Sequence, residues 1–527
     1  MMKIIFCGGA ETVTGSCYLL KTDSGENLLV DCGLFQGSKA IKERNYGDFP
    51  FEPNEIDWVL LTHAHIDHIG RIPKLYKKGY RGPIITTKIT KELCAVLLPD
   101  SAYIQEMEVE RKNRKNLRAG KPLLEPIYTV SDAEECIKLF EGKGYDEIIK
   151  LNDNVSLRFT DAGHILGSSI IEIWIKGTDE VKKVTFTGDL GNYDKPIVND
   201  PEILEGTDFL VIESTYGSRN HDEEDEAARI EKLSEVIEST FNRGGNVVIP
   251  AFAVERTQDL IFDLNKLIQQ GKIKSENIFL DSPLAIAITE IFCKNADSFD
   301  EAAQDFSRET GKCPLEVQNL RFTRTAEESK AINNIKSGAI IISASGMCDA
   351  GRIKHHLKHN LWRRNSTILF IGYQAQGTLG RTILDGARKV KIHGEEVTVN
   401  ARIESIKGYS SHSDQGDILN WINNITRKPE LIFLVHGEVE ESSILKTLIE
   451  ENYQIETHIP YYLEEYTLTK RARPVSHYDF SRKTAAELQE ELEDLLSQLQ
   501  QVGERLILEE EYHKADELFK ELKKKLT

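Results

Sequence analysis

A histidine-rich run constrains the fold of this chain more than any other feature. The run HAHIDH at residues 63–68 follows a β-type stretch and precedes a helix start. At a strand end, His63 and His65 point the same way, and the turn that follows swings Asp67 and His68 to the other side. One short loop can therefore supply ligands to two adjacent metal ions. Imidazole and carboxylate ligands without thiolates suit zinc in an open catalytic site, whereas the alternative is a histidine-rich surface turn.

Such a loop cannot complete two coordination shells, so further ligands are expected at other strand ends. His164 lies in a Gly-flanked turn between two predicted strands, and Asp189 follows a third. A carboxylate at such a position can bridge two metals that lie about 3.5–4 Å apart. Asp31 ends an early strand and suits a supporting role, in which it fixes the tautomer of a ligand histidine. Taken alone, each of these residues could instead be a strand-end turn residue.

The first two hundred residues predict a layered α/β domain that is rich in sheet. Short β-type runs alternate with Gly or Asp, and one helical stretch interrupts them. The strands are predicted at residues 3–6, 17–21, 27–31, 58–62, 155–160, 169–175 and 184–187, and the helical stretch at 85–145.

A second unit with a different pattern follows. Its strands are predicted at residues 209–212, 246–250, 278–281 and 339–343, and helices at 255–267, 284–292 and 353–361. Alternation of this kind predicts a parallel sheet with helices on its faces. Alternating strand patterns return at 389–393, 397–407 and 431–435. The second unit is therefore expected to be inserted into the first, with domains at 1–206, 207–386 and 387–475.

The tail, residues 476–527, carries leucines spaced four and three apart, which is typical of a coiled coil. Gly503 interrupts this pattern, and a second helical stretch follows at 512–526. We expect a helical hairpin or an oligomerisation helix that pairs in a homodimer or with a protein partner.

Composition excludes several classes of protein. Lys and Arg number 66 against 85 Asp and Glu, a net charge of −19, which excludes a wholly basic nucleic-acid-binding surface but permits a local basic groove. No apolar run approaches the roughly 18 residues of a membrane span, and the N-terminus lacks a signal peptide. The eight cysteines are scattered without a C-x-x-C pair, so neither a disulfide framework nor a thiolate metal site is expected. A cytoplasmic location fits best.

The ordered series of metal-type residues resembles that of the metallo-β-lactamase fold. Residues 1–473 resemble the β-CASP branch of that superfamily, which includes the cleavage and polyadenylation endonuclease and ribonuclease J. The further motifs that carry this resemblance are Glu213 after a strand, His412 within YSSHSD and His436 within VHGE. The resemblance implies a four-layered αββα domain, an inserted parallel α/β β-CASP domain and a helical tail.

The resemblance also implies a catalytic site with two zinc ions. One zinc would be held by His63, His65 and His164, the other by Asp67, His68 and His436, with Asp189 bridging them. Glu213 would orient His412 as general acid, and Asp31 and Asp67 would complete the catalytic set. A metal-bridging hydroxide would attack phosphorus and leave a 5′-phosphate and a 3′-hydroxyl.

Single-stranded RNA is the substrate that the resemblance favours. RNA-cleaving members have histidine at the position of His436, whereas DNA-repair members tend to have valine. Whether cleavage is internal or proceeds from an end stays open. A DNA nuclease, a hydrolase of small esters or thioesters, and a non-catalytic RNA-processing scaffold are the alternatives. The large insertion argues against small substrates, and the intact ligand set argues against a scaffold.

Several residues of the inserted unit and one helix are candidates for contact with RNA. The run SASGM at 343–347 is predicted to end a strand and open a helix, whose amides attract phosphate. Six cations and no acid occupy residues 111–121, which fits either the edge of an RNA path or a solvated helix face. The predicted RNA contacts are Ser343, Ser345, Gly346, Arg352, Lys354 and Arg381.

Overall fold

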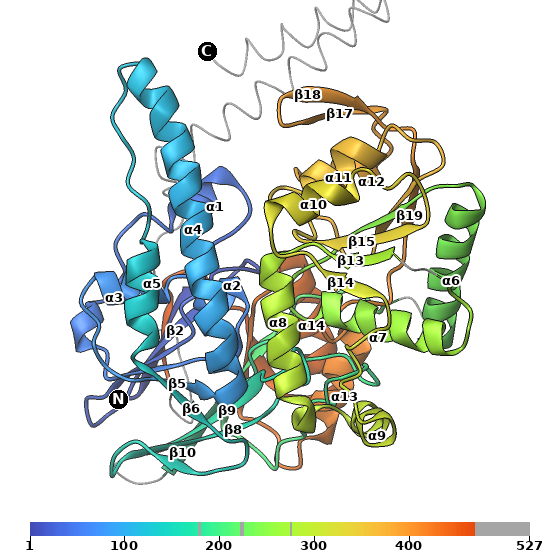
Figure 1. The fold of residues 1–527 in the computed structure, drawn as a ribbon. Helices are drawn as coiled ribbons and strands as arrows, with labels where there is room; N and C mark the ends of the chain where they lie inside the picture. The colour runs from blue at the N-terminus through green and yellow to red at the C-terminus, as the bar shows by residue number, and fades with distance from the viewer. Residues whose placement is uncertain (178–180, 222–225, 275–276, 469–527) are drawn as a thin grey trace, which may run out of the picture.

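Two seven-stranded sheets face each other in the computed structural model, which describes residues 1–177, 181–221, 226–274 and 277–468 (Figure 1). The first sheet has the order β22-β1-β2-β3-β4-β5-β6. Its strands are β1 (Lys3–Gly8), β2 (Cys17–Lys21), β3 (Asn27–Val30), β4 (Trp58–Leu60), β5 (Ile84–Thr87), β6 (Phe140–Lys143) and β22 (Glu465–Thr467).

The second sheet has the order β21-β20-β11-β10-β9-β8-β7. Its strands are β7 (Ile149–Lys150), β8 (Val155–Asp161), β9 (Ser169–Lys176), β10 (Val181–Phe186), β11 (Phe209–Glu213), β20 (Leu431–Val435) and β21 (Glu456–His458). Strands such as β9, with the sequence SIIEIWIK, are buried on both faces, because the sheet is covered on both sides.

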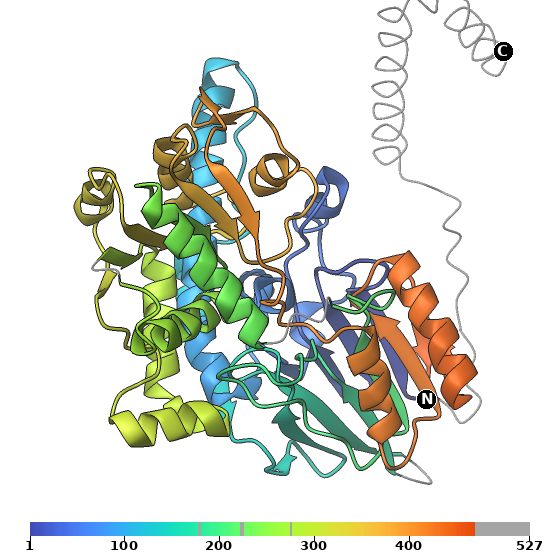
Figure 2. The ribbon, with the colours of Figure 1, turned by 90° about the vertical axis from the view of Figure 1, so that its right-hand side faces the viewer.

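Helices cover the outer faces of this sandwich and make it four-layered. The helices α3 (Ile72–Lys77), α4 (Lys88–Arg118) and α5 (Val130–Ile137) lie on the first sheet, and α13 (Gln415–Asn424) and α14 (Val439–Tyr453) lie on the second (Figures 1 and 2). Phe6, Phe159 and Phe433 fill the layer between the sheets. Trp421 and Ile212 pack in the layer under α13 and α14. The predicted αββα architecture is confirmed.

An inserted domain, which we call the cap (residues 226–405), contains the third sheet. Its strands β14 (Leu320–Phe322), β13 (Asn277–Leu280), β15 (Ala339–Ser343), β12 (Val247–Pro250), β16 (Thr367–Phe370) and β19 (Arg402–Ser405) pair in this order, all in parallel. The helices of the cap are α6 (Glu226–Asn242), α7 (Arg256–Gln269), α8 (Pro283–Lys294), α9 (Glu301–Thr310), α10 (Ala326–Ile332), α11 (Ile353–Asn360) and α12 (Leu379–Leu384). A hairpin of β17 (Lys389–Ile392) and β18 (Glu395–Thr398) packs beside them. The predicted parallel insertion is confirmed.

The sheet membership of two strands corrects the predicted domain boundaries. Strand β11, predicted as the first strand of the insertion, pairs with β10 and β20 in the second sheet of the sandwich. Strand β19, predicted to belong to the returning sandwich, pairs with β16 in the cap. A short apolar strand looks the same in either sheet, so its local sequence does not reveal its partners. The tail 476–527 lies outside the described residues.

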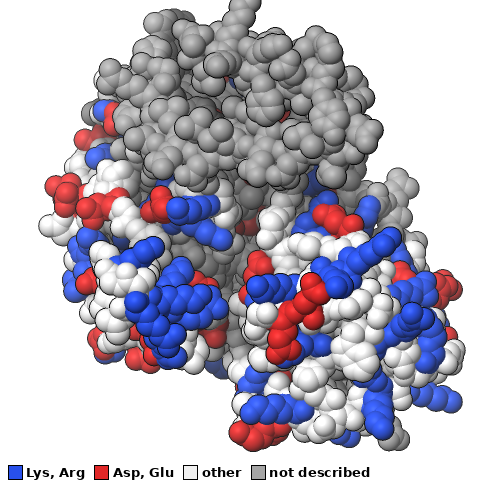
Figure 3. Space-filling model, turned by 90° about the horizontal axis from the view of Figure 1, so that it is seen from above, with Lys and Arg blue, Asp and Glu red and all other residues white. Residues whose placement is uncertain are grey.

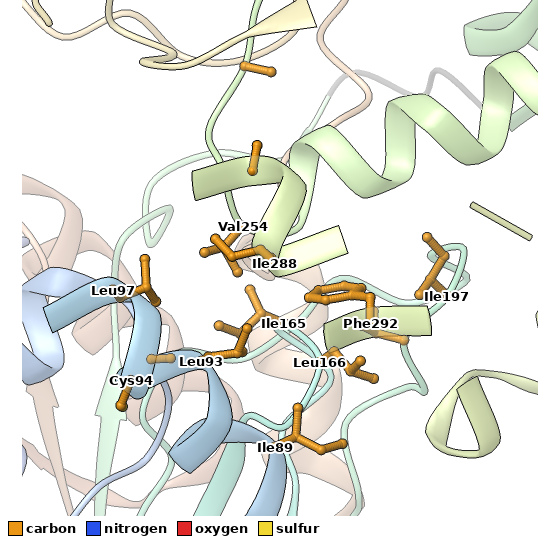
Figure 4. Packing of buried hydrophobic residues seen from close by; sticks show 14 of the residues in the cluster. Ile89, Leu93, Cys94, Leu97, Ile165, Leu166, Ile197, Val254, Ile288 and Phe292 are labelled. Atoms are coloured by element: carbon orange, nitrogen blue, oxygen red, sulfur yellow. The ribbon is translucent and has the colours of Figure 1, made fainter. Parts of the chain in front are cut away.

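The cap and the sandwich share one continuous apolar core. Ile89, Leu93 and Leu97 of α4 pack with Val254, Ile288 and Phe292 of the cap and with Ile165 and Leu166 of a sandwich loop (Figure 4). An ion pair between Lys294 and Glu92, at 2.6 Å, joins α8 to α4 at the edge of this contact. The cap is therefore anchored next to the loop that carries His164.

One disulfide is present, although the sequence predicted no disulfide framework. Cys293 at the end of α8 is bonded to Cys313, which follows α9. The two cysteines are 20 residues apart in the sequence, and this separation alone does not indicate that they pair. The other cysteines, all in the sandwich except Cys348, are free and buried.

None of the helices within the described ranges is both long enough and apolar enough to cross a membrane.

The shared core makes a prediction about stability. Phe292 of α8 is fully buried in the core that the cap shares with the sandwich. Phe292→Ala therefore removes ring contacts from both domains and leaves a cavity. We expect a loss of about 3–5 kcal/mol in the free energy of unfolding, measured by urea denaturation. Tyr103→Ala on α4, where the side chain is 56% exposed, is the matched control and should change stability by less than about 0.5 kcal/mol. Equal effects of the two changes would contradict this role for the interface.

Candidate metal centre between the sandwich and the cap

The histidine-rich loop leaves the end of β4 and enters α2 (Ile66–Ile69). His65 is the N-cap of α2, so Asp67 and His68 lie on its first turn. The loop is held against the chain that follows β3, where a Cβ on Gly33 would lie 1.5 Å from the Asp67 carbonyl oxygen. Only glycine permits this approach. The close packing fixes where the imidazoles of the loop point.

Three imidazoles converge on one side of Asp189. Nδ1 of His65 lies 3.2 Å from Nε2 of His63 and 3.1 Å from Nε2 of His164. The Oδ2 atom of Asp189 lies 3.5 Å from Nε2 of His63 and 3.6 Å from Nε2 of His164. These four atoms form a compact nitrogen and oxygen donor set of the type that divalent metals take.

A second group of donors lies on the other side of the same carboxylate. The Oδ1 atom of Asp189 is 3.3 Å from Nε2 of His68 and 3.4 Å from Nδ1 of His436. The carboxylate of Asp67 lies 3.3 Å from Nε2 of His436. Both Nε2 of His68 and Oδ1 of Asp189 are buried and make no hydrogen bond to any residue that the structure describes. Buried polar atoms without a partner are costly, and a metal ion between them would satisfy both.

Asp31 fixes the orientation of two of these imidazoles. Its Oδ2 atom accepts a hydrogen bond from Nδ1 of His68 at 2.8 Å and another from the Thr62 hydroxyl at 2.8 Å. The same hydroxyl oxygen lies 3.0 Å from Nδ1 of His63 and can accept its proton. The outer nitrogens of both rings are therefore occupied, and Nε2 of each faces the cluster. Similarly, Nδ1 of His164 donates to the carbonyl oxygen of Ser411 at 3.1 Å.

Glu213 and His412 form a pair at the edge of the cluster. The buried carboxylate of Glu213, at the end of β11, lies 3.1 Å from Nδ1 of His412 and accepts the backbone N–H of Leu190 at 2.6 Å. The His412 ring is centred 4.5 Å from the His164 ring, and its side chain remains 16% exposed. Its Nε2 atom has no hydrogen bond to any described residue and is open to the site.

Burial and neighbouring charges divide the histidines into two groups. Burial, together with the charge of His68, holds the pKa of His63 well below its usual range. Burial and the charge of His412 have the same effect on His164, and burial lowers the pKa of His65 to about 4. For His68, burial acts against protonation, but Asp189 and Asp31 outweigh it and raise the pKa well above its usual value. Asp189 likewise outweighs burial at His436 and raises that pKa.

These protonation states fit the donor set of a metalloenzyme. Burial disfavours ionisation of Asp189, yet the nearby histidines, His436 first, hold its pKa well below the usual range. A carboxylate that is ionised at neutral pH thus lies between neutral imidazoles on one side and proton-bearing ones on the other. Metal ions bind the deprotonated forms of such ligands and displace any protons.

Two contacts to the site lie beyond what sequence motifs singled out. The Thr215 hydroxyl lies 3.1 Å from Nδ1 of His436 and also donates to the carbonyl oxygen of the same residue at 3.1 Å. Tyr216, the next residue, has its ring 6.0 Å from that of His412. Their position two and three residues after the motif residue Glu213 was the available signal.

The predicted RNA contacts are placed less favourably than expected. Residues 344–352 separate β15 from α11, so SASGM does not open a helix. The Ser343 hydroxyl is buried and donates to the carbonyl oxygen of Asp281, and Ser345 and Gly346 lie in the loop. Arg352 is bound by Asp281 at 2.7 Å.

Two further cations of that prediction also have partners in the protein. Lys354 donates to the carbonyl oxygen of Asp349 at 3.1 Å, and Arg381 pairs with Asp385 at 2.8 Å. These partners compete with phosphate, and local sequence does not reveal them.

The basic stretch 111–121 forms the exposed end of α4 and the turn after it. Two of its cations, Lys112 and Arg114, pair with Glu108 and Glu110 one turn earlier. Seen from above, Lys and Arg side chains lie on both lobes of the molecule, with Asp and Glu side chains among them (Figure 3).

The fold and the clustered donors define a metal-dependent hydrolase, and three family models agree. The metallo-β-lactamase superfamily matches residues 10–164, the β-CASP domain matches 257–383, and the Zn-dependent metallo-hydrolase RNA specificity domain matches 396–460.

Curated proteins similar to this chain extend over most of its length. Ribonuclease TTHA0252 of Thermus thermophilus is 36% identical over 85% of this chain and 96% of its own length. The transcription termination factor FttA of Methanosarcina mazei is 30% identical over 86% of this chain and 70% of its own length. FttA of Thermococcus kodakarensis is 31% identical over 87% of this chain and 70% of its own length.

The chain therefore belongs to the β-CASP family of the metallo-β-lactamase superfamily. It is accordingly a metal-dependent nucleic acid hydrolase.

The two groups of histidines predict a pH dependence of metal binding. Between pH 6 and 8 the imidazoles of His63, His65 and His164 are already neutral, so a metal there displaces few protons. His68 and His436 must lose protons first, so affinity on their side of Asp189 should fall by about tenfold or more per pH unit on acidification. Competition with a chelator, after removal of all metal, measures both affinities. Two sites with the same pH dependence would contradict the assignment.

Proposed function

We propose that this protein is a ribonuclease that uses two zinc ions to hydrolyse phosphodiester bonds in single-stranded RNA. The observation that carries the proposal is a single buried carboxylate, Asp189, which lies between two groups of metal-type donors. The Zn-dependent RNA specificity model and the ribonuclease relative support the choice of metal and substrate.

The donor sets suit two ions that share Asp189. His63, His65 and His164 would hold one zinc, and Asp67, His68 and His436 the other. When bound, zinc ions lower the pKa of water to supply a nucleophile and stabilise the charge on phosphate oxygens. All other steps rest on side chains of this chain.

In this proposal, Glu213 and His412 protonate the leaving oxygen. The carboxylate of Glu213 accepts a hydrogen bond from Nδ1 of His412 and so keeps that nitrogen protonated. Nε2 then carries the proton that is transferred to the leaving oxygen. An expelled ribose oxygen is a poor leaving group until it is protonated. Donation to the 3′ oxygen would leave a 3′-hydroxyl on one product and a 5′-phosphate on the other.

Asp31 and the Ser411 carbonyl have a positioning role in this scheme. They hold the rings of His68 and His164 through Nδ1, so Nε2 of each is directed at the centre of the site. Loss of such a partner typically weakens metal affinity or activity by 10- to 100-fold.

Cleavage of matched nucleic acids tests the proposed function. Zinc-loaded protein should cut a 5′-labelled single-stranded RNA much faster than the DNA strand of the same sequence. Asp189→Asn should abolish cutting, because the neutral amide lacks the negative charge with which the carboxylate would bridge two metal ions. Gel analysis of the products gives the rate and the cleavage mode. Equal cutting of DNA would favour the alternative nuclease, and no cutting of either strand by zinc-loaded protein would contradict the proposal.

The role of the general acid gives a separate prediction. His412→Ala should lower the rate of RNA cleavage by about 10²- to 10⁴-fold. Metal content should not change, because His412 belongs to neither proposed ligand set and its Nδ1 is held by Glu213 at 3.1 Å. An RNA with sulfur in place of the 3′ bridging oxygen has a leaving group that needs no proton, so the variant should cut it nearly as fast as the unaltered protein. An equal loss of rate on both substrates would show that His412 does not donate the proton.

A further inference from the structure

An arginine of the cap lies beside the proposed site without an acidic partner. Arg256 is the first residue of α7 and follows the loop that leaves β12. Strands β15, β12 and β16 are neighbours and run parallel, so the loops at their carboxyl ends meet at one edge of the cap. Ligands of open α/β sheets bind at this edge, at the carboxyl ends of the strands.

The guanidinium is held between loops from the three strands. It lies over the Phe252 ring at 5.0 Å, a cation–π contact. Phe252 packs on the backbone of Gly346, where a Cβ would lie 2.7 Å from the ring. On the other side, a Cβ on Gly372 would lie 2.1 Å from Nη1 of Arg256. The orientation of the side chain is therefore set by close packing and not by hydrogen bonds.

No described residue pairs with this charge. Nη1 of Arg256 is buried without a hydrogen bond, and the side chain makes no ion pair within 4.0 Å and no hydrogen bond to any described residue. The nearby carboxylate of Asp259 is paired with Lys195 at 3.1 Å. A buried donor without a partner costs about 1–3 kcal/mol, and more when it is charged.

Two other arginines of the cap show the usual arrangement. Arg229 is bound by Asp263 at 2.9 Å, and Arg352 by Asp281 at 2.7 Å. Burial lowers the pKa of Arg256 below its usual value, with the Tyr216 phenol and the Asp259 carboxylate acting in the opposite direction. A guanidinium nevertheless keeps its charge at neutral pH. Among the described residues, the guanidinium of Arg256 thus lacks the carboxylate partner that Arg229 and Arg352 have.

The surroundings of Arg256 connect it to the proposed catalytic residues. The preceding residue, Glu255, accepts the backbone N–H of Leu166 at 3.2 Å, on the loop that carries His164. The Tyr216 phenol, which acts to raise the pKa of Arg256, belongs to a ring that lies 6.0 Å from the ring of His412. Arg256 therefore directly follows a residue that contacts the His164 loop.

We propose that Arg256 is a substrate-positioning residue that binds a backbone phosphate of the RNA strand on the cap side of the metal centre. This inference rests on the proposed ribonuclease function. A planar guanidinium binds phosphate through two parallel hydrogen bonds, which fix the strand as well as attract it.

RNA binding without cleavage tests this role. In full-length protein with Asp189→Asn, the affinity for a short fluorescent single-stranded RNA is measured by anisotropy at salt concentrations from about 50 to 200 mM. Adding Arg256→Gln should weaken binding by about tenfold and reduce the slope of log affinity against log salt by about 0.7, the loss of one phosphate contact. Arg256→Lys should keep the slope and weaken binding severalfold, because lysine retains the charge but not the fork.

The control is Arg308→Gln on α9, an exposed arginine that pairs with Asp305 at 2.6 Å. It should change neither affinity nor slope. A purely structural role for Arg256 would lower the thermal midpoint and leave the slope unchanged, and that result would overturn the proposal. If Arg256→Gln does not fold, a folded Arg256→Lys variant that binds RNA as tightly as its parent would overturn it as well.

The outcomes also separate this inference from the proposed function. If the unaltered protein cuts RNA while the Arg256 variants bind it normally, only the role of Arg256 is wrong. If the unaltered protein neither binds nor cuts RNA, the proposed function itself fails.

Discussion

The buried carboxylate of Asp189 is the point on which the site depends. The side chain is 2% exposed, and an isolated charge at that depth would be very unfavourable. It is surrounded by imidazole nitrogens at 3.3–3.9 Å, from His63, His68, His164, His412 and His436. These residues come from four separate parts of the sequence, so the carboxylate has favourable surroundings only when both sheets have assembled. The cluster of candidate ligands around Asp189 therefore forms only when the sandwich has folded.

The loop that carries His164 links this centre to the cap. Its imidazole faces Asp189, while the two residues that follow, Ile165 and Leu166, pack into the core shared with α4 and α8. The backbone of Leu166 also donates to Glu255 of the cap. The cap therefore has a defined position relative to the candidate ligands.

The chemistry of the site was predictable from sequence to the extent that it depends on strand ends. His63, His65, Asp67 and His68 are close in sequence, and the structure brings them together with His164, Asp189 and His436, as the motif order implied. A layered, sheet-rich domain and a parallel insertion follow from the pattern of apolar residues, whereas the αββα arrangement followed from the family resemblance. Partner choice did not follow from that pattern, because a buried strand such as β11 has the same apolar sequence in either sheet.

Properties that arise from contacts across the fold also escaped the sequence. The sequence predicted that Arg352 binds phosphate, but in the structure it is paired with Asp281. The sequence likewise gave no sign that Cys293 is bonded to Cys313. Arg256 shows the opposite case, since an arginine without a partner can be recognised only when its whole surroundings are known.

The most direct test of the central claim is anomalous X-ray diffraction at the zinc absorption edge from crystals of the zinc-loaded protein. The account predicts two peaks about 3.5–4 Å apart, on either side of the Asp189 carboxylate. A single peak, or peaks away from Asp189, would contradict it.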